Sequence, residues 1–508
     1  MRHAARVRMP LTAADCALAE ILELMAYMHR PRQSRALCEM WRCVVCVWLP
    51  WATIGHAAEP LASQDRPPNV VLLISDDQRS DTIHAWGNPQ IRTPHLDRLV
   101  SSGCSFLRAT CANPICTPSR GEIMTGVSGF RNGIRDFGRQ RAPGVRSWGE
   151  QFRDAGFRTV YVGKWHNHGR PRDWGYQATR GLFASGGGRW AVPTFDWNGK
   201  PVTGYRGWVF QSADRQYFPE RGVGLTSDIS TDFADAALQF LKTIGKQRFF
   251  LHVNFTAPHD PLLMPIGHEH VYDPEQLKLP ANFRAKHPFD HGNLEGRDER
   301  LFDWPRTSKE VRREMAVYYS VITHMDQQIG RILDGLVDSG QAQHTIVVFA
   351  SDHGLAIGSH GLRGKQNMYE HTIGVPLIIS GPGIPKDKRI RSQCYLRDLF
   401  PTICQLSGVD IPAGVEGRSL VPALQGDDPP IYQEIFGYFR DAQRMIRGDR
   451  WKLIEYPRIH RFQLFDLEQD PYEVHDLAED RQHAARLREL RARLRAWQAS
   501  VRDPLING

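Results

Sequence analysis

The run Asn69-Val70-Val71-Leu72-Leu73-Ile74-Ser75, followed directly by Asp76-Asp77, decides the fold that this sequence predicts. The run is short and continuously apolar between Val70 and Ile74, which indicates a strand that is buried on both faces of a sheet. The two aspartates then stand at the carboxyl end of that strand. Because open α/β sheets bind their ligands at this edge, the two carboxylates are candidate functional groups.

Three later segments repeat the pattern of an apolar strand that ends in metal-binding or proton-transferring residue types. Their polar ends are Gly163-Lys164-Trp165-His166, Pro258-His259-Asp260-Pro261 and Ser351-Asp352-His353-Gly354. Alternation of strands and helices predicts an α/β fold with a large mixed, mostly parallel sheet sandwiched by helices. Segments with the apolar spacing of helices lie between the strands, at 93–102, 148–155, 227–243 and 310–336.

The pattern changes near residue 431, where short alternating runs replace the continuous apolar strands. Such runs predict a smaller C-terminal antiparallel sheet. We therefore expect a larger domain over 66–425 and a C-terminal α+β subdomain over 431–508. The last helix is expected to pack on the small sheet through one apolar stripe, formed by Leu487, Leu490, Leu494 and Trp497.

Two long polar segments, 167–225 and 258–308, show no clear period of helix or strand. Long irregular loops in a compact domain are often functional. We interpret both segments as loops that shape a pocket, with plain surface structure as the alternative.

The first 58 residues have the pattern of a leader. A basic segment from Met40 to Arg42 precedes an apolar run from Cys43 to Ile54, and small residues follow at Gly55-His56-Ala57. This is the pattern of a secretory signal peptide, and the apolar run is short for a membrane span. We expect translation to start at Met40 and the protein to be secreted or periplasmic, without a stable membrane span; an internal anchor or a disordered leader is the alternative.

Composition limits the class of protein. The chain is 41% hydrophobic and 24% charged, as in ordinary globular proteins, so a fibrous or disordered protein is not indicated. The net charge is +8, but residues 481–508 alone hold seven arginines against two acidic residues. A solvated helix face explains this excess, and no nucleic-acid-binding motif accompanies it.

Cys116 opens the stretch Cys116-Thr117-Pro118-Ser119-Arg120. Pro118 favours the first turn of a helix, where free amides and the helix dipole attract anions and lower a thiol pKa. Arg120 adds a planar cation within one turn. This chemistry indicates an activated cysteine or an anion site, and a buried structural cysteine is the plain alternative. The cysteines Cys104, Cys111, Cys394 and Cys404 could form one or two disulfides in an oxidising compartment.

Three carboxylates at the predicted sheet edge, Asp76, Asp77 and Asp352, suit a hard divalent cation. His353 adds a nitrogen donor beside them. A helix cap explains any one aspartate at a strand end, but it explains all three poorly, because clustered carboxylates repel one another without a cation.

Residues 69–480 resemble the type I sulfatases, the formylglycine-dependent branch of the alkaline phosphatase superfamily. The family signature C-[ST]-P-S-R is matched at every position of 116–120. The four strand ends and Gly364-Lys365 follow in the family's order. The resemblance implies a sulfuric ester hydrolase that acts on sulfated carbohydrate. It also implies that a formylglycine-generating enzyme converts Cys116 into 3-oxoalanine (formylglycine), whose hydrate attacks sulfur.

The same resemblance implies a role for each candidate residue. Arg120 would orient the hydrate, His166 would act as the base that releases sulfate, and His259 would protonate the leaving oxygen. The sulfate would be bound by Lys164, His259 and Lys365. Ca²⁺, with Mg²⁺ as the alternative, would be held by five residues: Asp76, Asp77, Cys116, Asp352 and His353. At the last of these positions the family often has asparagine.

Arg363 stands where the family often has an aromatic residue. We expect Arg363 to face the pocket and to favour a carboxylated or multiply sulfated sugar, with an exposed loop arginine as the alternative. Two other functions also fit the motifs. One is a phosphodiesterase or phosphonate monoester hydrolase of the same superfamily, and the other is a non-catalytic glycan-binding relative, against which the complete set of candidate groups argues.

Overall fold

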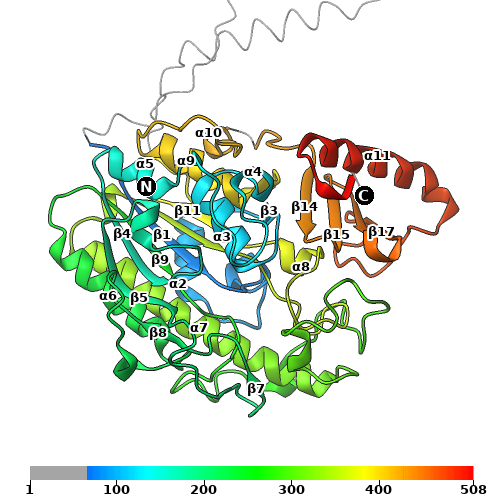
Figure 1. Cartoon of the computed structure of the whole chain (residues 1–508), viewed down its shortest axis with the longest axis horizontal. Coiled ribbons are helices and arrows are strands. Elements are labelled where there is room, and N and C mark those ends of the chain that lie inside the picture. Colours follow the sequence, from blue (N-terminus) through cyan, green and yellow to red (C-terminus); the bar gives the residue numbers. More distant parts are fainter. Residues whose placement is uncertain (1–65, 427, 507–508) are drawn as a thin grey trace, which may run out of the picture. The chain divides into compact units, whose positions relative to one another are not determined.

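A computed structural model describes residues 66–426 and 428–506, so the predicted leader and the start at Met40 lie outside the described residues. No described helix is both long enough and apolar enough to cross a membrane. A mixed nine-stranded sheet forms the centre of the larger, N-terminal part of the described residues (Figure 1). Its strands, in spatial order, are β12 (Lys388–Ile390), β2 (Gly103–Phe106), β11 (Leu377–Ser380), β10 (Thr345–Ser351), β1 (Asn69–Ser75), β9 (Phe249–Asn254), β4 (Arg158–Lys164), β5 (Ala178–Ser185) and β8 (Trp208–Phe210).

The four apolar strands predicted from the sequence are neighbours in this sheet. Strand β1 pairs in parallel with β10 on one side and with β9 on the other, and β9 pairs in parallel with β4. Ser75 is in register with Ser351, and Ile74 with Asn254. The polar ends of all four strands therefore meet at one edge, as predicted, and antiparallel β11 makes the sheet mixed.

Helices cover both faces of the sheet because the side chains of β1 alternate between two cores. Val70, Leu72 and Ile74 pack with residues of the helices α5 (Trp148–Asp154), α9 (Leu399–Leu406) and α10 (Val421–Gln425). Val71 and Leu73 pack in the opposite core. The helices of that core are α2 (Pro94–Ser102), α6 (Ile229–Thr243) and α7 (Ser308–Asp338).

The two polar segments differ in structure. Segment 258–308 is irregular, as predicted, with only short 3-10 turns at Pro274–Gln276 and Glu299–Leu301. Segment 167–225 instead contains β5 and β8, which extend the main sheet, and the small pair β6 (Thr194–Phe195) and β7 (Pro201–Val202). The sequence of β5, ATRGLFAS, is only partly buried near the sheet edge, so it lacks the apolar run that identifies the central strands.

The C-terminal part forms the predicted antiparallel sheet and packed helix (Figure 1). On α11 (Ala484–Ser500), Leu490 and Leu494 are buried against apolar residues of the sheet, and the ring of Trp497 stacks on Phe436 with centroids 4.9 Å apart. The strands are β14 (Ile435–Phe439), β15 (Gln443–Arg447), β16 (Trp451–Tyr456) and β17 (Arg461–Asp466).

The expected disulfides are absent from the described residues. The thiol of Cys104 lies 3.2 Å from the carbonyl of Pro385, and that of Cys111 lies 3.1 Å from the carbonyl of Asn113. Buried free thiols behave as small apolar side chains, so these cysteines belong to the core. The described cysteines, all buried and free, are Cys104, Cys111, Cys116, Cys394 and Cys404.

Candidate active site

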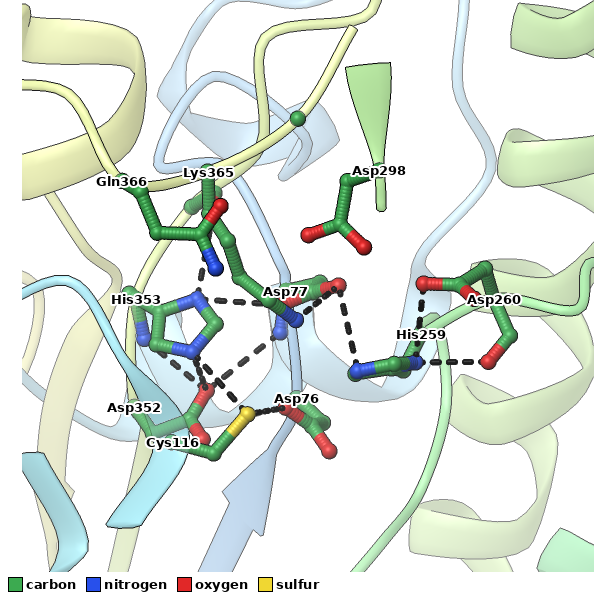
Figure 2. Close-up of polar contacts among 12 residues, drawn as sticks. Asp76, Asp77, Cys116, His259, Asp260, Asp298, Asp352, His353, Lys365 and Gln366 are labelled. Atoms are coloured by element: carbon green, nitrogen blue, oxygen red, sulfur yellow. Dashed lines mark hydrogen bonds and ion pairs between the residues drawn. The ribbon is translucent and has the colours of Figure 1, made fainter. Parts of the chain in front are cut away.

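The carboxyl ends of β1 and β10 bring the acidic cluster together (Figure 2). The donor atoms of Asp76, Asp77, Cys116 and His353 lie within 4.8 Å of one another and are all buried. Asp352 lies alongside rather than within this group, with one carboxylate oxygen 3.6 Å from His353 Nε2. This donor set of carboxylates and one imidazole fits a divalent cation.

Cys116 is the first residue of α3 (Cys116–Thr125), so the helix N-terminus predicted from Pro118 is confirmed. Its Sγ lies 3.4 Å from a carboxylate oxygen of Asp76 and 3.3 Å from Nε2 of His353. Burial raises the thiol pKa, but the positive charges of Lys164, Lys365 and His353 outweigh burial and hold the pKa of Cys116 well below its ordinary value.

Three cations from separate elements compensate the buried carboxylates. Lys164, at the end of β4, pairs with Asp76, and Lys365 donates to both oxygens of Asp77 at 2.8 and 2.9 Å. Arg120 donates from Nε to Asp352 at 3.0 Å. Each cation is buried, so each of the three carboxylates has a buried positive partner.

A close backbone approach positions Lys164. The register of β4 against β5 shifts between Val162 and Gly163. At Gly163, with φ of 88°, an added Cβ would lie 2.0 Å from the carbonyl oxygen of Asn254. Only glycine fits both this backbone angle and this contact. The backbone path at Gly163 directs the next side chain, that of Lys164, toward the acidic cluster.

The two candidate proton carriers have opposite pKa shifts. Burial lowers the pKa of His166 to about 4, which leaves a neutral imidazole at pH 7. For His259, burial and Lys365 lower the pKa, but Asp77, Asp260 and Asp76 outweigh them and raise it. His166 is thus in the form that accepts a proton, and His259 favours the form that donates one.

Two residues of the site were not predicted. Asn254, at the end of β9, accepts a hydrogen bond from Arg120 at 2.6 Å, and Tyr205 donates its hydroxyl to Asp76 at 2.6 Å. The position of Asn254 at a strand end is the signal that would have identified it. Tyr205 stands in segment 167–225 with a φ of 57°, and no sequence pattern marks it.

Arg363 does not face the pocket, so its expected role is corrected. Its side chain is 2% exposed and donates to Glu314 of α7 at 2.7 Å. The backbone amides of Arg363 and Gly364 donate to the carboxylate of Glu299 at 2.9 and 2.8 Å. Glu314 therefore holds the Arg363 side chain in the protein interior, and Glu299 fixes the backbone just before Lys365; both glutamates are buried.

A cavity of about 460 Å³ opens onto the thiol. The basic side chains of Lys365 and His259 line this cavity together with the aromatic side chains of Phe137, Tyr205 and Trp208. Such a cavity suits an anionic group attached to a ring. Its other lining residues are Cys116, His166, Thr203, Gly204, Asn293, Gly296, Arg297, Gln366 and Arg440.

Comparison with protein families agrees with this geometry. The family model described as Sulfatase matches residues 68–409, which span every candidate site residue from Asp76 to Lys365. A second model, described as the C-terminal part of N-sulphoglucosamine sulphohydrolase, matches residues 358–500. The chain therefore belongs to the sulfatase family, whose members hydrolyse sulfate esters. The resemblance stated from the motifs is confirmed.

Individual relatives are distant but cover nearly the whole chain. An arylsulfatase of Clostridium perfringens is 29% identical over 457 residues, which cover 84% of this chain and 93% of that protein. An N-acetylglucosamine-6-O-sulfatase of Bacteroides thetaiotaomicron is 25% identical over 531 residues, with 90% and 91% covered. The solved phosphonate monoester hydrolase of Agrobacterium radiobacter has a TM-score of 0.71 at 22% identity, with 85% and 96% covered, and this likeness concerns the fold alone.

Proposed function

We propose that this sulfatase hydrolyses sulfate monoesters on carbohydrate, with a formylglycine made from Cys116 and a divalent metal. The observation that carries the proposal is the position of Cys116. Its thiol lies at a helix N-terminus, among the acidic cluster and two buried lysines, and faces a cavity that suits an anionic ring compound. The relative named as an N-acetylglucosamine-6-O-sulfatase supports a sugar as the substrate.

The metal would be held by Asp76, Asp77, His353 and the residue made from Cys116, with Asp352 beside them. A bound Ca²⁺ or Mg²⁺ supplies Lewis-acid stabilisation of the sulfate oxygens. The hydrate of formylglycine would supply a hydroxyl nucleophile and a second hydroxyl through which the aldehyde is restored.

The chain's own cations orient the reacting groups. Lys164 and Lys365 are buried beside the thiol and would bind sulfate oxygens, which carry most of the negative charge. Arg120, held by Asp352 and Asn254, fixes the carboxylates that face the nucleophile. Such preorganised charges stabilise the transition state without rearrangement during the reaction.

The two histidines would divide the proton transfers. Neutral His166 lines the cavity beside Cys116 and would accept the proton whose loss releases sulfate. His259, whose pKa is raised, would donate a proton to the sugar's alcohol oxygen as that oxygen separates from sulfur. The opposite directions of the two shifts support this assignment.

Mass spectrometry of the peptide that contains Cys116 tests the proposal, using protein made together with a formylglycine-generating enzyme. Conversion of the thiol to an aldehyde lowers the peptide mass by about 18 Da. Sulfate release from sulfated sugars should accompany this change. An unmodified thiol, or faster hydrolysis of phosphonate and phosphate diesters than of sulfate esters, would contradict the proposal.

We also propose that the protein is exported, on the pattern of a basic segment, an apolar run and small residues over 40–58. N-terminal sequencing of the protein from the medium or the periplasm should then give a mature start close to residue 58. A cell-retained protein that begins at Met1 would contradict this.

A further inference from the structure

The cavity beside Cys116 and a second cavity share one lining residue. Arg440, in the turn between β14 and β15, lines both. The second cavity, of about 440 Å³, is lined by Phe130 of α4 (Gly129–Asn132) and Tyr438 of β14, whose ring centroids lie 4.5 Å apart. Its lining also includes Arg135, Asp136, Arg139, Asp441 and Arg444.

The charges around this second cavity do not balance. Arg440 pairs with Asp136 at 2.9 Å, and Arg444 donates to Asp503 at 2.8 Å. Asp441 is paired with Arg458. Arg135 and Arg139 are exposed and form no ion pair with an acidic residue within 66–426 and 428–506. Two guanidinium groups therefore face the cavity with their charge uncompensated.

We infer that this second cavity is an anion subsite for the sugar next to the one that carries the reacting sulfate. The inference rests on the proposed function, because it assumes that the first sulfate lies at Cys116. A second sulfate or a uronate carboxylate would then reach Arg440, Arg135 and Arg139, since guanidinium groups bind such anions through paired hydrogen bonds. The preferred substrate is a polyanionic glycan rather than a sugar with a single charge.

Binding to the inactive variant Cys116→Ala separates the subsite from catalysis. Titration calorimetry compares three ligands: a disaccharide whose only charge is one sulfate ester, the same disaccharide with a second sulfate on the other sugar, and a disaccharide with one sulfate and one uronic acid. We expect the doubly charged ligands to bind about tenfold more tightly, and the preference to fall in 0.5 M NaCl because these contacts are partly exposed. The two doubly charged ligands distinguish a sulfate subsite from a carboxylate subsite.

The variants Arg135→Gln and Arg139→Gln, combined in the Cys116→Ala chain, should remove most of this tenfold preference. Arg98→Gln is the matched control, because Arg98 is an exposed arginine on α2 that pairs with Asp334. Equal affinity for singly and doubly charged ligands, or a preference that survives in the double variant, would overturn the inference, as would failure of every disaccharide to bind. Sulfate release by the enzyme with Cys116 intact is measured in parallel, and its failure would count against the proposed function instead.

Discussion

At the scale of single residues, the carboxylate of Asp76 depends on donors from several parts of the chain. It accepts hydrogen bonds from the hydroxyl of Tyr205 and from Lys164, and Arg120 lies 3.7 Å away. Burial and the neighbouring Cys116 raise the pKa of Asp76, but Lys164, His259 and Arg120 outweigh them and lower it. Removal of one donor therefore leaves a buried negative charge less well compensated.

Tyr205→Phe tests this dependence. Loss of a hydrogen bond to a charged group costs about 1.5–3 kcal/mol, which corresponds to roughly 10- to 150-fold in rate if the bond acts in the transition state. We expect kcat/KM for a sulfated sugar to fall by up to that amount, and the thermal midpoint to fall as well because the same buried bond stabilises the folded state. Tyr217→Phe, in the same segment but lining a neighbouring cavity, should keep its activity. Equal effects of both variants would contradict a role for the Tyr205 hydroxyl.

Metal removal tests the donor set of Asp76, Asp77, Cys116 and His353. Chelation should abolish activity, and Ca²⁺ or Mg²⁺ should restore it. A ligand at 1,000 times its Kd stabilises a fold by about 4 kcal/mol, so the thermal midpoint should also fall on chelation. Asp77→Asn should weaken this response, whereas Asp81→Asn, at a carboxylate that is 58% exposed, should respond as the parent protein does. Full activity in a metal-free preparation would contradict the site.

The sequence predicted those site residues that follow apolar strands, because strand direction alone brings such ends together. Asp76, Asp77 and Asp352 are of this kind. Tyr205 could not be predicted, since it reaches Asp76 from the turn between β7 and β8, 129 residues away. The prediction for Arg363 was wrong because the two glutamates that hold it in the interior, Glu299 and Glu314, are distant from it in sequence.

At the scale of elements, a buried ion network joins the C-terminal sheet to α8 (Glu370–Ile373), close after Lys365. Lys452 of β16 donates to Glu370 at 2.8 Å and lies 2.6 Å from Glu473. Arg447 of β15 pairs with the other oxygen of Glu370 at 2.7 Å. The small sheet thus anchors the segment that carries a candidate sulfate-binding lysine.

Lys452→Met should be strongly destabilising, because it leaves buried carboxylates without a cation. Breaking a buried pair costs about 3–5 kcal/mol, which urea unfolding measures. Glu473→Gln is the matched comparison. Burial and the nearby Glu370 raise the pKa of Glu473 to about 7 despite Lys452, so this residue is partly protonated at neutral pH and a neutral amide should cost less than about 1 kcal/mol. Equal costs for both variants would contradict this assignment of charge.

Elements were predictable where one periodicity dominates. The central strands and α7 have long, consistent apolar patterns. Strands β2, β12 and β13 (Cys394–Tyr395) contain four, three and two residues, too short for a pattern to appear. They form because neighbouring backbone offers hydrogen-bond partners, which is a tertiary effect that local sequence does not contain.

At the scale of the whole molecule, stability at acid pH should depend on four buried histidines, which belong to segment 282–294, to the loop before α8 and to α8 itself. Burial lowers the pKa of His287 to about 4 and holds those of the other three well below the ordinary value. Both ring nitrogens of His291 and of His371 lack a hydrogen-bond partner among the described residues. The four are His287, His291, His360 and His371.

These shifts fix the direction of the pH dependence. Well above pH 6.5 the histidines are neutral in both the folded and the unfolded state, so they contribute no pH dependence to the stability. As the pH falls from 6.5 toward 4, the unfolded chain binds protons that the folded chain excludes, so stability falls by up to about 1.4 kcal/mol per pH unit for each histidine. His291→Phe should therefore reduce the loss between pH 7 and 5 by about 2 kcal/mol. His475→Phe, at a side chain that is 79% exposed, should leave the pH profile unchanged, and parallel profiles for both variants would contradict the prediction.

The pairing of β1 with β10 also sets an order of events during synthesis of the chain. Ser119 and Arg120, next to the thiol, bind Asp352, so the pocket wall around Cys116 is complete only after β10 has been made. Roughly 235 residues separate Cys116 from Ser351. At a translation rate of 5–20 residues per second, this distance corresponds to roughly 10–50 s. An enzyme that converts Cys116, as proposed above, would therefore have a window of that length before the finished sheet encloses its target.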